Sequence, residues 1–450
     1  MSATGDTICA VATPPGIGGI GIVRVSGPAV RDISRGLTGS LPAPRHAVLA
    51  AFRAADGEVI DSGLVLYFPA PQSFTGEDVL ELQGHGGSHV LGRVLQRVRE
   101  LGARDAHAGE FSRRAFLNDK LDLVQAEAIA DLIESGTDAA ARAAQRSLQG
   151  EFSRLIHDLQ ETLTGLRVFV EAAIDLPDEE IDFLAESDVL DRCAEAVSRL
   201  DAVLSGARQG RLLRDGIVLA IIGRPNAGKS SLLNALAGAD RAIVTDIPGT
   251  TRDVLREQIE LDGVPVHIAD TAGIRETRDR IEAEGVRRAR ETLADADVAL
   301  LVEDVTDPTA DDDVLHREIP PGVHCIRVRN KSDLLPDAPV TGESAENPPI
   351  VVISARTGQG IDGLRRMIRA AVGARDQAEG AFSARRRHID ALLRARGHLE
   401  AGTAEMAASG SGELLAEELR LAQQALGEIT GEMLPDDLLG RIFASFCIGK

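Results

Sequence analysis

A glycine-rich stretch near the middle of the chain has the residue types and the spacing of a phosphate-binding loop. Residues 223–230 read GRPNAGKS, which fits the pattern G-x-x-x-x-G-K-[ST]. The stretch follows an apolar run, GIVLAIIG (216–223), and precedes a helix-like segment, SLLNALAG (231–238). Backbone amides freed by the glycines would close around phosphates, Lys229 would reach the β- and γ-phosphates, and Ser230 would bind Mg²⁺. The context predicts a nucleoside triphosphate site.

Three further motifs follow in chain order and narrow the nucleotide to GTP. In DTAG (270–273), Asp270 would lie in the Mg²⁺ sphere and the Gly273 amide would face the γ-phosphate. In NKSD (330–333), Asp333 would accept two hydrogen bonds from the N1–H and N2–H₂ edge of guanine, which adenine does not offer. SAR (354–356) would cover the base. Each motif alone also fits a structural loop, but their order and spacing predict a GTPase.

The segment TDIPGTTRD (245–253) lies between the phosphate loop and DTAG, where a switch I segment belongs. Thr251 is its candidate second Mg²⁺ ligand. A loop that is simply mobile is the alternative, but the position favours the functional interpretation. Ile274 follows DTAG and cannot orient the attacking water as the glutamine of Ras-like GTPases does. Another acid or amide must therefore position water, and another cation must supply charge.

The residues expected to contact GTP come from these five segments. They offer backbone amides, small side chains or a charge that faces phosphate or guanine. The full set is Asn226, Ala227, Gly228, Lys229, Ser230, Ser231, Thr245, Asp246, Ile247, Pro248, Gly249, Thr250, Thr251, Asp270, Thr271, Ala272, Gly273, Asn330, Lys331, Asp333, Ser354, Ala355 and Arg356.

The composition of the chain indicates which classes of protein it can belong to. The chain has 450 residues, of which 44% are hydrophobic and 26% charged, so it has ample material for several folded domains. A net charge of −21 and only 11 Phe, one Tyr and no Trp argue against a general nucleic-acid coat protein and against a base-stacking platform. The four scattered cysteines suit reduced thiols. With neither a secretory signal nor a long apolar run, we expect a cytoplasmic protein without a membrane segment.

The elements that must position the motifs change character along the chain. Residues 1–118 have short strand patterns at 7–13, 19–25, 63–68 and 78–82 and a helix pattern at 90–101, which predicts a mixed α/β domain. Residues 119–214 and 376–450 are helical, and apolar residues at three- and four-residue steps over 148–170 predict one long amphipathic helix. Residues 215–375 alternate apolar strands and helices, which predicts a doubly wound sheet.

Each helical block has one apolar stripe that needs a partner. We therefore expect one discontinuous helical domain, built from both blocks, with a Ras-like G domain inserted between them. The predicted fold class is α/β plus all-α.

Long stretches of the chain resemble the tRNA-modification GTPase family called MnmE or TrmE. In the G domain these are GRPNAGKSSLLN, IVTDIPGTTRD, DTAGIRE and NKSD, parts of which are shared with the Era and Der GTPases. The flanks are more specific: ATPPGIGGIGIVRVSG, SFTGEDVLELQGHGG, GEFSRRAFLNDKLDLVQAEAIADLI and the terminal CIGK. The likeness covers essentially the whole chain.

This resemblance implies a folate-binding and dimerising N-terminal domain. It implies a homodimer that forms a heterotetramer with an FAD-dependent MnmG-type partner. The pair would add an aminomethyl or carboxymethylaminomethyl group to C5 of the wobble uridine, position 34, of certain tRNAs. A 5-formyl- or 5,10-methylene-tetrahydrofolate would carry the one-carbon unit, and K⁺ would stand in for an arginine finger beside Mg²⁺.

The resemblance also implies roles for individual residues. The family's K⁺ ligands match Asn226, Thr245, Ile247 and Thr250, and its water-orienting acid matches Glu282, with Glu284 as a nearby alternative. Its folate contacts match Arg24, Glu81, Lys120 and Lys450, each of which would otherwise form a surface salt bridge. Cys447 matches the C-terminal cysteine, which could lie near the modification centre or be an inert thiol.

Two other functions are compatible with parts of the sequence. An Era-like switch GTPase in ribosome assembly would act by binding a partner, but such chains end in a basic RNA-binding domain. A folate-dependent methyl transferase with a vestigial G domain is a third interpretation, and the intact GKS and NKSD motifs argue against it.

Overall fold

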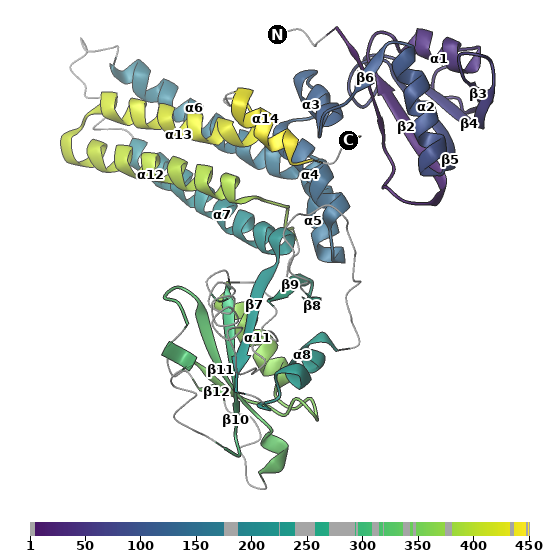
Figure 1. Ribbon diagram of the computed structural model, residues 1–450. Coiled ribbons are helices and arrows are strands. Elements are labelled where there is room, and N and C mark those ends of the chain that lie inside the picture. Colours follow the sequence, from purple (N-terminus) through teal and green to yellow (C-terminus); the bar gives the residue numbers. More distant parts are fainter. Residues whose placement is uncertain are drawn as a thin grey trace, which may run out of the picture. The chain divides into compact units, whose positions relative to one another are not determined.

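The computed structural model describes residues 5–174, 188–224, 226–238, 257–269, 293, 296–307, 315–317, 319–335, 343–344, 348–373, 380–432, 436–446 and 449. Contacts divide the chain into two units (Figure 1). The first holds residues 1–130, 147–197 and 394–450, and the second holds residues 131–146 and 198–393. Within the described ranges, no helix combines the length and the apolar composition needed to span a bilayer.

A six-stranded, mainly antiparallel sheet forms the N-terminal part of the first unit. Its strand order is β3-β4-β5-β2-β1-β6. Helices α1 and α2 cover one face, where Val23, Val25, Leu80 and Leu82 are buried, and α3 follows the last strand. The elements are β1 (Thr7–Val11), β2 (Gly18–Ser26), α1 (Val30–Thr38), β3 (Val48–Arg53), β4 (Val59–Phe68), β5 (Val79–Gly86), α2 (Ser88–Glu100), β6 (Ala103–Asp105) and α3 (Glu110–Leu117).

A partly buried ion network joins α3 to β6 and to the segments just before β1 and β5. Arg114 has a 4% exposed side chain and pairs with Asp6, Glu77 and Glu110 at 2.8, 3.0 and 3.1 Å. Arg104 pairs with Glu110 at 2.6 Å. Burial opposes ionisation of Glu110, but hydrogen bonds from Arg104, the His107 amide and Arg114 outweigh it and lower its pKa to about 2. The network therefore depends on an ionised Glu110.

We expect Glu110→Gln to destabilise the fold by roughly 2–3 kcal/mol at neutral pH, because charge-assisted hydrogen bonds to two arginines are weakened. The folded pKa lies below the ordinary value of 4.5. The ionised carboxylate therefore contributes its full stabilisation of the fold above pH 4.5, and this stabilisation is lost as the pH falls toward 2. Thermal unfolding at pH 7 and pH 3 should show the gap between the two proteins narrowing at pH 3. An equal gap at both pH values would contradict the prediction.

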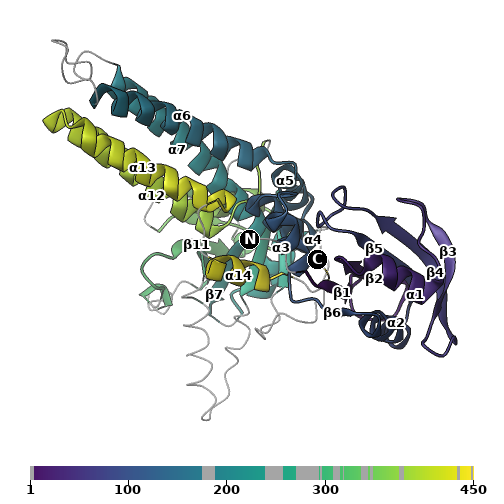
Figure 2. The same cartoon turned by 90° about the horizontal axis from the view of Figure 1, so that it is seen from above.

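The helical segments come from both sides of the G domain in the sequence. In the first unit, α6 and α13 lie side by side (Figures 1 and 2), and Gln423 links them through Arg167 at 2.9 Å and Thr164 at 2.7 Å. The helices are α4 (Leu123–Glu134), α5 (Asp138–Leu148), α6 (Glu151–Ile174), α7 (Val189–Asp215), α12 (Arg386–Ser409), α13 (Gly412–Thr430) and α14 (Asp436–Ala444).

The second unit contains a seven-stranded sheet with the order β12-β13-β11-β10-β7-β9-β8. Strands β7, β9, β10, β11 and β13 are parallel, whereas the edge strands β8 and β12 are antiparallel to their neighbours. Its elements are β7 (Ile217–Gly223), α8 (Lys229–Ala237), β8 (Glu257–Leu261), β9 (Val264–Ala269), β10 (Val298–Asp304), β11 (His324–Asn330), η1 (Ser332–Leu334), β12 (Glu343–Ser344), β13 (Ile350–Val352) and α11 (Ile361–Ala371).

The predicted fold class is confirmed: a mixed α/β N-terminal domain, helices from both blocks, and an inserted doubly wound sheet. The long helix expected over 148–170 is present as α6 (Glu151–Ile174). It begins three residues later than expected, because Gly150 adopts a left-handed φ of +83° between α5 and α6. The domain boundaries themselves stay a prediction.

Candidate functional site

The glycine-rich loop begins where the central strand β7 ends. Strand β9 lies next to β7 on one side and β10 lies next to it on the other, so the strand order reverses at β7. In doubly wound sheets, ligands bind outside the carboxyl ends of the strands at such a switch point. Gly223 has a φ of +151°, and a Cβ there would lie 2.3 Å from the Val302 carbonyl oxygen. Gly228 has a φ of +96°, and its Cβ would lie 2.2 Å from Asn330 Nδ2. Both positions therefore require glycine, because a Cβ would collide with a neighbouring atom.

Lys229 is the first residue of α8, directly after the loop. Its Nζ donates to the carbonyl oxygens of Gly223 at 2.7 Å and Arg224 at 2.8 Å. Burial lowers the pKa of Lys229. The loop thus holds a cation beside the free amides at the N-terminus of α8, a combination that suits an anion such as phosphate.

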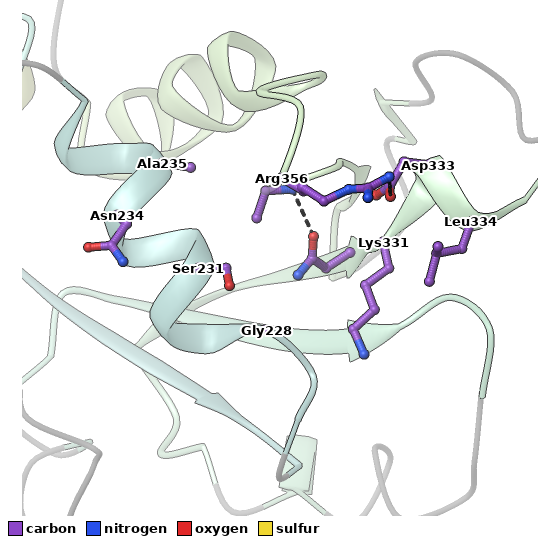
Figure 3. Close-up of a pocket in the computed structure, with 10 residues that line it drawn as sticks. Gly228, Ser231, Asn234, Ala235, Lys331, Asp333, Leu334 and Arg356 are labelled. Atoms are coloured by element: carbon purple, nitrogen blue, oxygen red, sulfur yellow. Dashed lines mark hydrogen bonds and ion pairs between the residues drawn. The ribbon is translucent and has the colours of Figure 1, made fainter.

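Asn330, at the end of β11, joins two loops of the site. Its side chain is buried, donates from Nδ2 to the Ala227 carbonyl at 3.0 Å, and accepts at Oδ1 from the Ala355 amide at 3.0 Å. The dashed line in Figure 3 marks the second of these bonds. Asn330 therefore fixes the phosphate loop against the SAR loop, a bridging role that the NKSD motif alone did not reveal.

Asp333 presents its carboxylate on the same side. Its Oδ1 accepts from the buried Ser354 hydroxyl at 2.6 Å, and its Oδ2 pairs with Arg356 at 2.6 Å. The hydrogen bond from Ser354 and the charge of Arg356 lower the pKa of Asp333. The carboxylate is therefore ionised at neutral pH and acts purely as an acceptor, as pairing with the N1–H and N2–H₂ groups of guanine requires.

Lys331 has a left-handed φ of +69°, and its Nζ reaches Asp304 Oδ2 at 2.5 Å. Asp304 ends β10, and sequence reasoning missed it. The available signal was the pair of acidic residues, Glu303 and Asp304, that follows the apolar run 298–302.

These groups surround one cavity of about 570 Å³ (Figure 3). Residues of α8 form one wall, and residues of NKSD and SAR form the other. Asn234, Ala235 and Leu334 line it without having been expected. The complete lining is Gly228, Ser231, Asn234, Ala235, Asn330, Lys331, Asp333, Leu334, Ala355 and Arg356. The predicted residues from three separated motifs thus meet in one cavity.

Two predicted cation ligands are described. Asn226 has a φ of +62° and an exposed side chain, and Ser230 is exposed on the first turn of α8. Their amide and hydroxyl oxygens are donors of the kind that Mg²⁺ and K⁺ accept. Residues outside the described ranges hold the other G-domain assignments: Thr245, Asp246, Ile247, Pro248, Gly249, Thr250, Thr251, Asp270, Thr271, Ala272, Gly273 and Glu282.

A second polar site lies on the face of the N-terminal sheet opposite α1 and α2. Arg24 pairs with Glu81 of the neighbouring strand at 2.9 Å, and its Nη1 donates to the Gly449 carbonyl at 3.4 Å. Its guanidinium lies 5.6 Å from the ring centroid of Phe74 and 5.9 Å from that of Phe111. The structure thus brings together two of the four predicted folate contacts and the C-terminal tail.

Of the remaining residues predicted for this second site, the structure describes Lys120 alone. Lys120 is exposed, and its side-chain stem runs past Gly76 in the loop before β5. Cys447 and Lys450 lie outside the described residues. Phe74 and Phe111 were missed, although Phe74 lies within the SFTGEDVLELQGHGG stretch quoted for the family.

The doubly wound sheet, the glycine-rich loop at its switch point and the carboxylate facing that loop define a GTPase with two additional domains. Family models match two long ranges: the GTP-binding protein TrmE N-terminus matches residues 7–120, and the MnmE helical domain matches residues 123–447. The chain belongs to the MnmE (TrmE) family.

Relatives named tRNA modification GTPase MnmE are similar over their full length. The protein of Pseudomonas paraeruginosa strain PA7 is 57% identical over 100% of both chains. That of Stutzerimonas stutzeri strain A1501 is 58% identical over 99% of both. That of Alkalilimnicola ehrlichii strain MLHE-1 is 54% identical, again over 99% of both.

Proposed function

We propose that the chain is a GTP-hydrolysing enzyme of tRNA modification, which acts with an FAD-dependent MnmG-type partner on C5 of the wobble uridine. A tetrahydrofolate supplies the one-carbon unit, and the product group is aminomethyl or carboxymethylaminomethyl. The observation that carries the proposal is full-length identity of 54–58% to relatives named tRNA modification GTPase MnmE. Because its substrate is tRNA, we place its work in the cytoplasm.

Nucleoside analysis of tRNA from a deletion strain tests this function. We expect the modified wobble uridines to disappear and to return with the unmutated gene. Lys229→Ala should not restore them, because the loop loses its cation. Arg35→Ala is a matched control, since Arg35 forms an exposed pair with Asp32 at 3.2 Å within α1, outside both motif sets. An unchanged nucleoside profile in the deletion strain would refute the function.

In the G domain, we propose that Lys229 and the loop amides bind the phosphates while Asp333 selects guanine. Ser230 and Thr251 would hold Mg²⁺, and Asn226, Thr245, Ile247 and Thr250 would hold K⁺, which supplies positive charge near the β–γ bridge when bound. Glu282 would orient the attacking water. The exposed oxygens of Asn226 and Ser230 at the loop support this arrangement.

On the N-terminal sheet, we propose that Arg24, Glu81, Lys120 and Lys450 bind the folate. A carboxylate such as Glu81 can pair with the amide and amino edge of a pterin. The Arg24–Glu81 pair and the Gly449 carbonyl beside it support the site. Cys447, two residues before Gly449, would then lie near the modification centre.

Deleting residues 447–450 is therefore expected to weaken 5-formyltetrahydrofolate binding at least tenfold, because the tail that contacts Arg24 is lost. GTP binding should stay within twofold of the full chain. Titration calorimetry with each ligand measures both effects. If the truncated protein binds the folate as tightly as the full chain, the tail has no part in the site.

A homodimer is supported by the apolar residues on the same open sheet face. Leu49 pairs with Leu64 in register, and their exposures are 75% and 41%. Leu64 pairs in turn with Gln83, two residues from Glu81 on the same face. A second copy that covers these leucines would lie next to the proposed folate site. The heterotetramer with the MnmG-type protein rests on the family alone.

A further inference from the structure

An ion pair lies along one edge of the nucleotide cavity. Arg356 Nη2 is 2.6 Å from Asp333 Oδ2, and both residues line the cavity of about 570 Å³. The Arg356 side chain is 73% exposed, whereas that of Asp333 is only 11% exposed. Figure 3 shows the Arg356 side chain running from the SAR segment to the carboxylate. Arg356 therefore covers the solvent side of the group that is proposed to bind guanine.

The backbone on both sides of this pair is held in place. The Ser332 amide donates to the Ile353 carbonyl at 3.1 Å. The Ala355 amide donates to Asn330 Oδ1 at 3.0 Å. These two bonds join the NKSD segment to the SAR segment. The pair can therefore open by rotation of the exposed Arg356 side chain, without a change in the backbone.

The Asp333 carboxylate can accept from guanine while the pair is formed. Its two oxygens offer about four acceptor positions. Of the contacts described, Ser354 uses one position on Oδ1 at 2.6 Å, and Arg356 uses one on Oδ2. Each oxygen then has one further position, which matches the two bonds that the N1–H and N2–H₂ groups of guanine make with a carboxylate. Guanine can thus bind without displacing Arg356.

An arginine suits this position better than a lysine would. The guanidinium carries its N–H donors in a planar fork, and its face stacks on aromatic rings. Arg356 can therefore hold Oδ2 with one edge while its plane covers a bound base. A lysine ammonium is a compact charge on a flexible stem. It would keep the ionic contact but would lack the flat surface.

We propose that Arg356 is a latch that retains the guanine nucleotide. Its side chain swings away to admit the base, then pairs with Asp333 and closes the edge of the cavity behind it. This inference rests on the proposed function, which assigns the cavity to a guanine nucleotide. Because an exposed ion pair has a modest strength, the latch slows release of the nucleotide and does not decide whether the nucleotide binds.

Release of a fluorescent GDP analogue from the full chain, chased with excess GDP, measures the latch. Arg356→Ala should release it about two- to fivefold faster than the unmutated protein, which is the size of effect expected for an exposed ion pair. Arg356→Lys should give an intermediate rate, because the charge is kept without the fork. Arg386→Ala is the matched control and should not change the rate, since Arg386 is 84% exposed and pairs with Asp390 at 4.0 Å within α12.

Salt dependence separates an ion pair from a merely structural role of Arg356. Raising NaCl from about 0.1 M to about 1 M shortens the screening length from about 10 Å to about 3 Å. The ratio of the release rates of Arg356→Ala and the unmutated protein should therefore fall toward one at high salt. If the arginine only supports the SAR segment, the ratio stays the same at both salt concentrations.

Asp333→Asn with xanthosine diphosphate provides a second arm of the test. This variant has no carboxylate for the latch, so adding Arg356→Ala should leave release of xanthosine diphosphate unchanged. Faster release in the double variant, a salt-independent ratio, or no acceleration of GDP release in Arg356→Ala would each overturn the proposal. Failure of the proposed function looks different, because Asp333→Asn would then still prefer GDP to xanthosine diphosphate.

Discussion

Asp333→Asn is expected to weaken GTP binding by roughly 10²–10⁴-fold and to make xanthosine triphosphate the preferred nucleotide. Two charge-assisted hydrogen bonds are lost, each worth about 1.5–3 kcal/mol. The carboxylate is positioned for them by Ser354 at 2.6 Å and Arg356 at 2.6 Å. Xanthine carries a carbonyl where guanine has its amino group, and the asparagine amide can donate to that carbonyl.

The change of preference is measured by titrating the unmutated protein and the Asp333→Asn variant with fluorescent analogues of GTP and of xanthosine triphosphate. Asp307→Asn is the control, because Asp307 pairs with Arg224 at 3.3 Å and is 64% exposed. It should leave the preference for GTP unchanged. If the Asp333 variant still prefers GTP as strongly as the unmutated protein, guanine is not read by this carboxylate.

The nucleotide cavity could be predicted from the sequence because its motifs are local. Gly228, with its left-handed φ, and the cation Lys229 are neighbours in the sequence, so the motif alone predicts how they lie relative to each other. The bonds between motifs could not be predicted in the same way. Asn330 reaches Ala227 across 103 positions, and Lys331 reaches Asp304 across 27. Such pairings depend on the strand order of the sheet, which cannot be predicted from the pattern of apolar residues in the sequence.

The same distinction explains the rest of the fold. Apolar patterns predicted α6 and the strands of the G domain, but the pattern of α6 continued across Gly150, where the backbone turns. It gave no sign of β3, whose side chains are mostly exposed or half-buried. Asp131 reads as an ordinary helix acid in the sequence. Its partners Arg214 and Arg385 lie 83 and 254 positions away, so its burial became visible only in three dimensions.

The proposed cation dependence of GTP hydrolysis rests on what the sequence lacks beside DTAG. Ile274 has no group that can orient water or donate to phosphate. Asn226 stands at the loop with an exposed side chain and a φ of +62°, a conformation that asparagine tolerates better than most residues. Its amide oxygen is free to serve as one ligand of a large monovalent ion, with switch I oxygens as the proposed others.

We therefore expect GTP hydrolysis to be much faster in KCl than in NaCl, because Na⁺ is too small for a site of this kind. An arginine finger is worth roughly 10³–10⁵ in rate, which sets the scale for an ion in its place. Asn226→Ala should lose most of the K⁺ stimulation but still bind GTP through Lys229 and the loop amides. Glu282→Ala should lower the rate in both salts while K⁺ still accelerates it. Steady-state hydrolysis in matched salts decides, and equal rates for the unmutated protein would refute the cation mechanism.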